Sequence, residues 1–274
     1  SFPNRRSSDL SQQPTLTPGQ AAKLRGRCGW ASSTASGKFG RIGVAALKGR
    51  QYTSTEDYTV TPELAQSLSF LASVIQWAPP RSIPVVGRPK DPLVIYSDAE
   101  FKPGSGAPPR LGWVLFPGWP HSPIGQTLLL DQAVMSIWLP RVQQIFAAEA
   151  FAALALPPQH AELLRGRDIV WFIDNLASCS SLIRGGSAQE DVEQIALAAH
   201  LLLMVLGCRV WFEWVDSGSN PADGLSRAGL DDCWTVNQGW DLSDGIIPGW
   251  AYCHLPAVDF ACALIQHWES SGLS

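Results

Sequence analysis

Two short apolar runs, each followed by an aspartate, constrain the fold of this chain more than any other feature of its sequence. Residues 93–96 read LVIY and lead to Ser97 and Asp98, and residues 169–173 read IVWFI and lead to Asp174. The second run is apolar at every position, a pattern typical of a central strand that is covered on both faces. The sequence therefore predicts a sheet with helices packed against it.

The elements around these runs predict a mixed α/β sheet. Further strands are expected over residues 111–116, 126–130 and 210–215. Helices are expected over residues 143–156, 175–184 and 187–207, and again after residue 220. The order is three strands, a helix, a strand, helices, a strand and a helix, which indicates a mixed sheet with helices on both faces.

Particular residues are expected to set the ends of these helices. The Pro-Pro pair at 157–158 should stop the first helix, and Gly185 should close the second. The stretch 187–190 reads SAQE, a capping box for the third helix, so Glu190 is interpreted as structural. Asn220 is expected to cap the last helix, with a proline in its first turn.

The first part of the chain is expected to be mostly helical. Thr17 should cap a helix that extends toward residue 52, with glycines weakening its second half, and another helix fits residues 62–77. The sequence thus predicts four regions. They are a basic, partly helical arm (1–55), a helix with a proline-rich linker (56–91), the sheet domain (92–230) and a C-terminal extension of unknown role (231–274).

Composition excludes some classes of protein. Hydrophobic residues make up 46% of the 274 residues and charged residues 16%, which excludes a disordered chain. The longest apolar run, residues 195–206, is interrupted by His200 and is too short to span a bilayer, so no membrane partner is expected. Without a signal peptide at its start, the chain is expected to be intracellular, cytoplasmic or nuclear, and to be a piece of a longer polypeptide. The six cysteines form no C-x-x-C pair, so a zinc site is not expected.

Charge is distributed unevenly along the chain. Residues 1–55 contain nine basic residues and one acid, a net charge of +8, so the remainder carries −12 within a total of −4. A basic arm on an acidic body suggests a polyanion held by the arm and metal ions held by the body. An ordinary solvated basic face is the alternative. The candidate nucleic-acid-binding residues are Lys23, Arg25, Arg27, Lys38 and Arg41.

Four acids stand at positions that suit a metal site. Asp98 and Asp174 end predicted strands, where open α/β sheets place ligands. Glu149 lies in an otherwise apolar helix, and a carboxylate there is costly unless a partner such as a metal ion pairs with it. Asp223 lies in the first turn of the last predicted helix.

Each of these acids also has a purely structural interpretation. Asp98 could favour a turn, and Asp174 could cap the helix that follows it. Glu149 could pair with an arginine, while Asp223 suits a helix N-terminus on dipole grounds alone. As a set, however, they follow the order strand, helix, strand, helix, with separations of 51, 25 and 49 residues by subtraction of their numbers.

In this order the sequence resembles the ribonuclease H family, especially the version found in retroelement polyproteins. The matching segments are 94–99 (VIYSDA), 147–150 (AAEA), 171–175 (WFIDN) and 220–227 (NPADGLSR). The last segment looks most like Ty3-type and DIRS-type elements, whose domains often end in an Asn-x-x-Ala-Asp-x-Leu-Ser-Arg stretch. The resemblance covers about residues 92–228, and the basic segment 16–52 is similar to the end of a reverse-transcriptase thumb. No polymerase Tyr-x-Asp-Asp motif is present.

The resemblance implies a ribonuclease H-like fold and a metal-dependent endonuclease that cleaves the RNA strand of RNA–DNA hybrids, joined to the polymerase portion of its parent polyprotein. It implies two Mg²⁺ ions, for which Mn²⁺ can substitute, held by carboxylates alone. Asp98 would bridge both ions, Glu149 and Asp174 would hold one, and Asp223 would hold the other.

One feature departs from the family pattern. Many members carry a histidine in the loop before the fourth acid, but residues 216–219 read DSGS, so turnover is expected to be slow. Two alternatives stay open. One is a nucleic-acid-binding remnant whose activity has decayed, and the other is a DNA-cleaving nuclease of the same fold.

Overall fold

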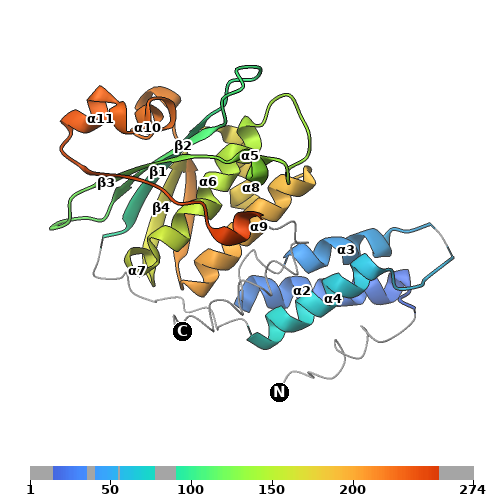
Figure 1. Ribbon diagram of the computed structural model, residues 1–274. Helices are drawn as coiled ribbons and strands as arrows, with labels where there is room; N and C mark the ends of the chain where they lie inside the picture. Colours follow the sequence, from blue (N-terminus) through green and yellow to red (C-terminus); the bar gives the residue numbers. More distant parts are fainter. Residues whose placement is uncertain (1–14, 36–40, 55, 78–90, 253–274) are drawn as a thin grey trace. The chain divides into compact units, whose positions relative to one another are not determined.

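The computed structural model describes residues 15–35, 41–54, 56–77 and 91–252, and the chain divides into two compact units (Figure 1). The described residues up to 77 belong to one unit, called the helical unit, and residues 91–252 belong to the other, called the sheet unit. No helix within the described ranges is both long and apolar enough to cross a membrane.

The described part of the helical unit contains three helices around a small apolar core. They are α2 (Pro18–Ala35), α3 (Arg41–Gln51) and α4 (Pro62–Trp77). Thr17 caps α2 as predicted, because its hydroxyl accepts a hydrogen bond of 3.3 Å from the backbone N–H of Gln20. The buried core residues are Leu16, Ala21, Cys28, Leu47, Leu64, Leu68 and Leu71. The helix over residues 62–77 is confirmed, whereas the region from residue 17 to residue 52 contains two helices.

Six strands form one sheet in the order β5-β4-β1-β2-β3-β6 (Figure 1). They are β1 (Leu93–Glu100), β2 (Arg110–Phe116), β3 (Ile124–Leu129), β4 (Asp168–Ile173), β5 (Arg209–Trp214) and β6 (Asp241–Asp244). β1, β2 and β3 pair antiparallel, β4 pairs parallel with both β1 and β5, and β6 pairs parallel with β3. The strands expected from the sequence are therefore present, and β6 continues the sheet unit past residue 230.

Helices cover both faces of this sheet. They are α5 (Gln132–Met135), α6 (Ile145–Gln159), α7 (Ala161–Leu164), α8 (Leu176–Arg184), α9 (Glu190–Val205), α10 (Asp223–Arg227) and α11 (Cys233–Asn237), with 3-10 turns η1 (Ser217–Ser219), η2 (Gly229–Asp231) and η3 (Gly249–Tyr252). In β2 the Trp113 indole donates to the Ala152 carbonyl of α6 at 3.1 Å, whereas the preceding Gly112 lies against α10. Successive strand residues point to opposite faces, so α6 and α10 lie on opposite sides, as predicted.

Apart from Glu149 and the terminal Gln159, helix α6 is apolar around its whole circumference, because it packs against both the sheet and α9 (Figure 1). Residues 147–157 of this helix are buried without exception. The helix does not stop before the prolines at 157–158 but extends to Gln159. Proline has a helical φ, so in a last turn it removes only its own N–H donor. The side-chain amide of Gln159 adds a donor at this end, to the Ala155 carbonyl at 2.9 Å.

The predicted ends of α8 are confirmed, but the capping box of α9 is not formed. The Asn175 side chain accepts hydrogen bonds from two backbone N–H groups in the first turn of α8, and Gly185 ends that helix with a φ of 64°. Helix α9 begins at Glu190, and its N-cap residue Gln189 makes no side-chain capping bond. The Ser187 hydroxyl instead accepts from the backbone N–H of Gln189 at 3.1 Å, in a turn that precedes the helix.

Asn220 does not cap α10, contrary to the sequence prediction, because the helix starts at Asp223 with Ala222 in the cap position. The side-chain oxygen Oδ1 of Asn220 accepts from the Ala222 backbone N–H at 3.1 Å, which closes a turn before the helix. Its amide donates to the Ser97 carbonyl at 3.1 Å. This buried side chain therefore ties the start of α10 to β1.

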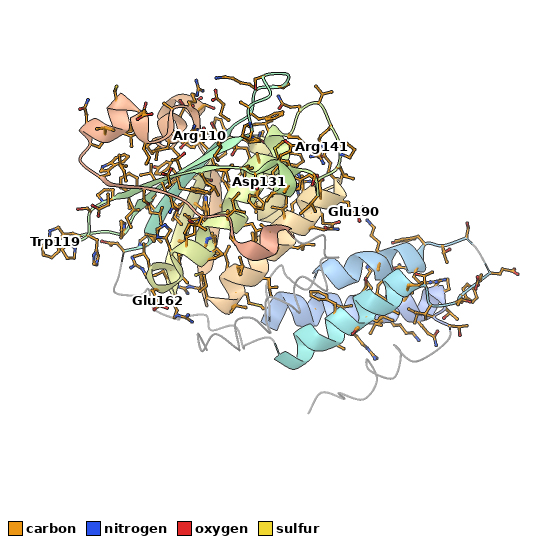
Figure 2. The ribbon with its side chains drawn as sticks, in the orientation of Figure 1. Arg110, Trp119, Asp131, Arg141, Glu162 and Glu190 are labelled. Carbon is orange, nitrogen blue, oxygen red and sulfur yellow. The ribbon has the colours of Figure 1, made fainter. Side chains whose placement is uncertain are left out.

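The two ends of strand β2 have different surroundings (Figure 2). Arg110 begins the strand, and its guanidinium packs against Gly229 of η2. At the other end, Trp119 lies in the turn before β3 and is 96% exposed.

Gly112→Ala should destabilise the sheet unit, because a Cβ there would lie 2.6 Å from the Ala222 carbonyl oxygen and 2.6 Å from the Ser226 backbone nitrogen. Overpacking of this kind costs about 1–3 kcal/mol, and a domain of this size loses about 2–4 °C of melting temperature per kcal/mol. Thermal unfolding of the full chain measures the loss. Gly186→Ala is the control, since the nearest neighbour of a Cβ there would be a Glu193 oxygen at 3.5 Å, an ordinary van der Waals contact. Equal melting temperatures for the two variants would contradict the prediction.

Candidate metal centre

The strand register brings two of the predicted acids to adjacent positions. β1 and β4 run parallel, and Ser97 pairs with Ile173, so Asp98 of β1 and Asp174, the first residue after β4, follow at neighbouring positions. Asp98 is the cross-strand partner of Gly112, and such partners share a face of the sheet. Asp98 therefore faces α10, and it is buried with 5% of its surface exposed.

Glu149 of α6 completes a cluster of three carboxylates. One oxygen each from Asp98, Glu149 and Asp174 lies within 4.8 Å of the others. Glu149 is only 2% exposed, and its Oε1 accepts a hydrogen bond of 3.1 Å from the Ala99 backbone N–H. Its Oε2 is buried and has no hydrogen-bond partner among the described residues. The cluster therefore presents a buried acceptor that is free to take a ligand.

Burial and mutual repulsion disfavour the charged forms of these acids. Burial raises the pKa of Asp98 to about 7, with the charge of Asp174 as the next cause, while a hydrogen bond from the Ser226 hydroxyl opposes the shift. Burial likewise raises the pKa of Glu149 well above its usual value, and the charges of Asp98 and Asp174 add to this effect. A compensating cation would let all three carboxylates ionise together.

Asp223 lies at the same cavity but outside this group of three. The cavity has a volume of about 240 Å³, and Asp223 lines it together with the three clustered acids. The carboxylate of Asp223 forms an ion pair of 2.7 Å with Arg227, one turn later on α10. The structure thus gathers all four predicted acids at one cavity and gives the fourth a cationic partner.

The chemistry of this donor set suits a hard divalent cation. The four acids supply only carboxylate oxygens, which are the ligands that Mg²⁺ and Mn²⁺ prefer. The unpartnered Glu149 Oε2 and the raised pKa of Asp98 are both features that a bound cation would relieve. The described residues at the cavity therefore fit a divalent metal ion.

Three further residues at this centre were not identified from the sequence as site residues. Ser226 donates to Asp98, and Arg227 lines the cavity. The Trp214 indole, at the end of β5, donates to the backbone carbonyl of Asp174 at 2.8 Å. Ser226 and Arg227 lie three and four residues after Asp223, so helical spacing was the available signal, whereas nothing local identified Trp214.

The predicted nucleic-acid-binding residues differ in their exposure and in the contacts they make. Lys23 and Arg27 are exposed on α2. Arg25 is partly buried, and its guanidinium donates to the Gln51 side chain at 2.8 Å and lies 6.0 Å from the centre of the Tyr52 ring. Arg41 begins α3, and Lys38 lies outside the described residues.

Comparisons with known proteins give similarities to ribonuclease H structures. No family model and no curated protein matches the chain. Ribonuclease H1 from the halophilic archaeon Halobacterium salinarum NRC-1 is 22% identical over 52% of this chain and 98% of that chain, with a TM-score of 0.39. The N-terminal ribonuclease H domain of a Mycobacterium tuberculosis protein, solved as a fusion with maltose-binding protein, is 18% identical over 53% of this chain and 97% of that chain, with a TM-score of 0.38. The mixed α/β sheet with helices on its faces that the sequence predicted is confirmed by the strand order and the covering helices.

Glu149→Gln should make the metal-free protein less sensitive to alkaline pH. Folding raises the pKa of this acid, so its ionisation destabilises the folded protein. The loss of stability begins as the pH rises above the pKa in the unfolded chain, about 4.3 for glutamate, and continues until the pH passes the pKa in the folded protein. The variant and the wild type should therefore melt alike near pH 5, and the variant should melt at least about 2 °C higher at pH 8, the shift expected from about 1 kcal/mol. Thermal scans with a chelator measure this. The control is Glu162→Gln, because that side chain is 80% exposed. If the melting temperatures of Glu149→Gln and the wild type changed in parallel with pH, the Glu149 carboxylate would not destabilise the metal-free protein, and the prediction would be wrong.

Proposed function

We propose that this protein is a metal-dependent endonuclease that hydrolyses the RNA strand of RNA–DNA hybrids. The observation that carries the proposal is the cluster of Asp98, Glu149 and Asp174, whose carboxylate oxygens lie within 4.8 Å of one another at a cavity that Asp223 also lines. The unpartnered buried oxygen of Glu149 supports a ligand at this cluster.

The residues of the cavity have separate tasks in this proposal. Bound magnesium would supply charge neutralisation at the attacking water and at the leaving oxygen of the phosphodiester. Asp98, central in the sheet and flanked by the other acids, would contact both ions. Glu149 and Asp174 would hold one ion, and Asp223 would hold the other. The hydrogen bonds from Ala99 to Glu149 and from Ser226 to Asp98 fix the orientation of two of these carboxylates.

The wider context belongs to the same proposal. The segment 220–227, NPADGLSR, supports a domain from the polyprotein of a Ty3-type or DIRS-type retroelement. In that setting the helical unit would be the end of a reverse-transcriptase thumb, and the polymerase portion of the polyprotein would be a partner. The basic residues of the arm, Lys23, Arg25, Arg27, Lys38 and Arg41, would contact the nucleic-acid backbone.

Asp174→Asn should abolish cleavage and leave the fold and hybrid binding nearly unchanged. Asparagine keeps the shape of the side chain but lacks the charge that a metal ion needs. We expect a loss of more than about a hundredfold, since removing even an outer partner of a metal ligand costs about 10- to 100-fold. Labelled RNA–DNA hybrid, duplex RNA and duplex DNA, each with Mg²⁺, are the substrates.

Each outcome of that assay has a definite meaning. Cleavage of the hybrid alone, lost in Asp174→Asn, supports the proposal. Hybrid binding without cleavage by the wild type would favour a decayed nucleic-acid-binding remnant. Preferred cleavage of duplex DNA would favour a DNA nuclease of the same fold, and full activity in Asp174→Asn would show that the Asp174 carboxylate holds no essential metal ion.

The Lys23→Ala/Arg27→Ala double variant should bind hybrid more weakly and with a flatter salt dependence. Each lost phosphate contact reduces the steepness of log affinity against log salt concentration by about 1. The two substitutions together should therefore reduce it by about 2. Arg25→Ala is the matched comparison. Because Arg25 also contacts Gln51 and Tyr52, its loss should lower the melting temperature as well as the slope, whereas the double variant should change the slope alone. An unchanged slope in the double variant would show that Lys23 and Arg27 do not contact phosphates of the hybrid.

A further inference from the structure

One cation lines the acidic cavity among the described residues. The lining includes five acids and the guanidinium of Arg227. The acids are Asp98, Glu100, Glu149, Asp174 and Asp223. The Arg227 side chain is 60% exposed, and a guanidinium has five N–H donors, so it can contact a ligand beyond its ion pair with Asp223.

The ion pair between Arg227 and Asp223 competes with metal binding. The pair joins Arg227 to Asp223 Oδ1 at 2.7 Å, and a carboxylate that holds a guanidinium is a weaker ligand for a metal ion. A divalent cation at Asp223 would therefore release the guanidinium beside the cavity. A phosphodiester that enters the cavity brings anionic oxygens, which a guanidinium matches in both charge and geometry.

The position of Arg227 does not depend on this ion pair. Helix α10 is fixed by the buried Leu225, whose carbonyl accepts a hydrogen bond of 2.9 Å from the Thr127 hydroxyl, and by Ser226, which donates to Asp98. The close approach of Gly112 to Ala222 and Ser226 holds the same helix against the sheet. Arg227 therefore stays at the cavity whichever partner it binds.

We propose that Arg227 is a phosphate-binding residue of this centre, which exchanges Asp223 for a backbone phosphate oxygen of the nucleic acid when a divalent cation binds. The inference rests on the proposed nuclease function and names a residue to contact the substrate there. Arg227 would then supply a cationic side chain at the cavity, where the loop 216–219 supplies no histidine.

Replacing Arg227 should change metal binding and phosphate binding in opposite directions. Without nucleic acid, Arg227→Ala should bind Mg²⁺ about two- to fivefold more tightly, the range expected from the loss of an exposed competing ion pair. With Ca²⁺ as a probe of divalent-dependent binding, the same variant should bind an RNA–DNA hybrid about ten- to a hundredfold more weakly, as expected for a lost charge-assisted contact. Hybrid cleavage at saturating Mg²⁺ should fall by a similar factor, and Arg227→Lys should recover part of both losses.

The control is Arg165→Ala, which removes a local ion pair of 3.8 Å between Arg165, at the end of α7, and Glu162 of that helix; neither residue lines the cavity. It should change neither metal affinity nor hybrid affinity. Lower Mg²⁺ affinity in Arg227→Ala would overturn the proposal, because it would give Arg227 a purely supporting role. Unchanged hybrid affinity and cleavage would overturn it as well. If the wild type cleaves no substrate, the proposed function fails, while the Mg²⁺ and Ca²⁺ binding measurements still decide the role of Arg227.

Discussion

The burial of Glu149 beside Asp98 and Asp174 is the physical constraint on which the sheet unit depends. Three carboxylates within 4.8 Å repel one another, and the two buried ones have raised pKa values. Such a cluster survives because the packing around it is extensive: α6 lies between the sheet and α9, and residues 147–157 are buried throughout. The apolar core thus holds in place a polar group that is unfavourable without a cation.

Helix α10 connects this cluster to the opposite face of the sheet. It is short, yet it carries both Ser226, which donates to Asp98, and Asp223, which lines the cavity. Its place is set by Gly112, where only a residue without a Cβ allows the helix backbone to approach, and by the buried amide of Asn220. The position of Asp223 is therefore set mainly by the contacts of neighbouring residues such as Asn220 and Ser226.

Local sequence patterns predicted most of the elements of this fold. Strand and helix positions follow from the periodicity of apolar residues, which reflects burial and is readable without partners. The glycine end of α8 was also predictable, since it acts within a few residues, whereas the cap of this helix is Asn175 and not Asp174, the residue that the structural interpretation had named. The predictions that were wrong, at Ser187, at Asn220 and at the prolines of α6, concern residues for which two local interactions compete. Tertiary contact decided between them, as when Asn220 donates to Ser97 of β1.

The sequence by itself determined which residues are available at the candidate centre: four acids, in the order strand, helix, strand, helix. It did so because carboxylates at apolar positions stand out from their surroundings. Only the tertiary structure decided that Ser226 reaches Asp98 across 128 residues and that Glu149 keeps one buried oxygen without a partner among the described residues. These facts depend on distances between atoms that strand register and helix packing bring together, and a one-dimensional pattern contains no such distances.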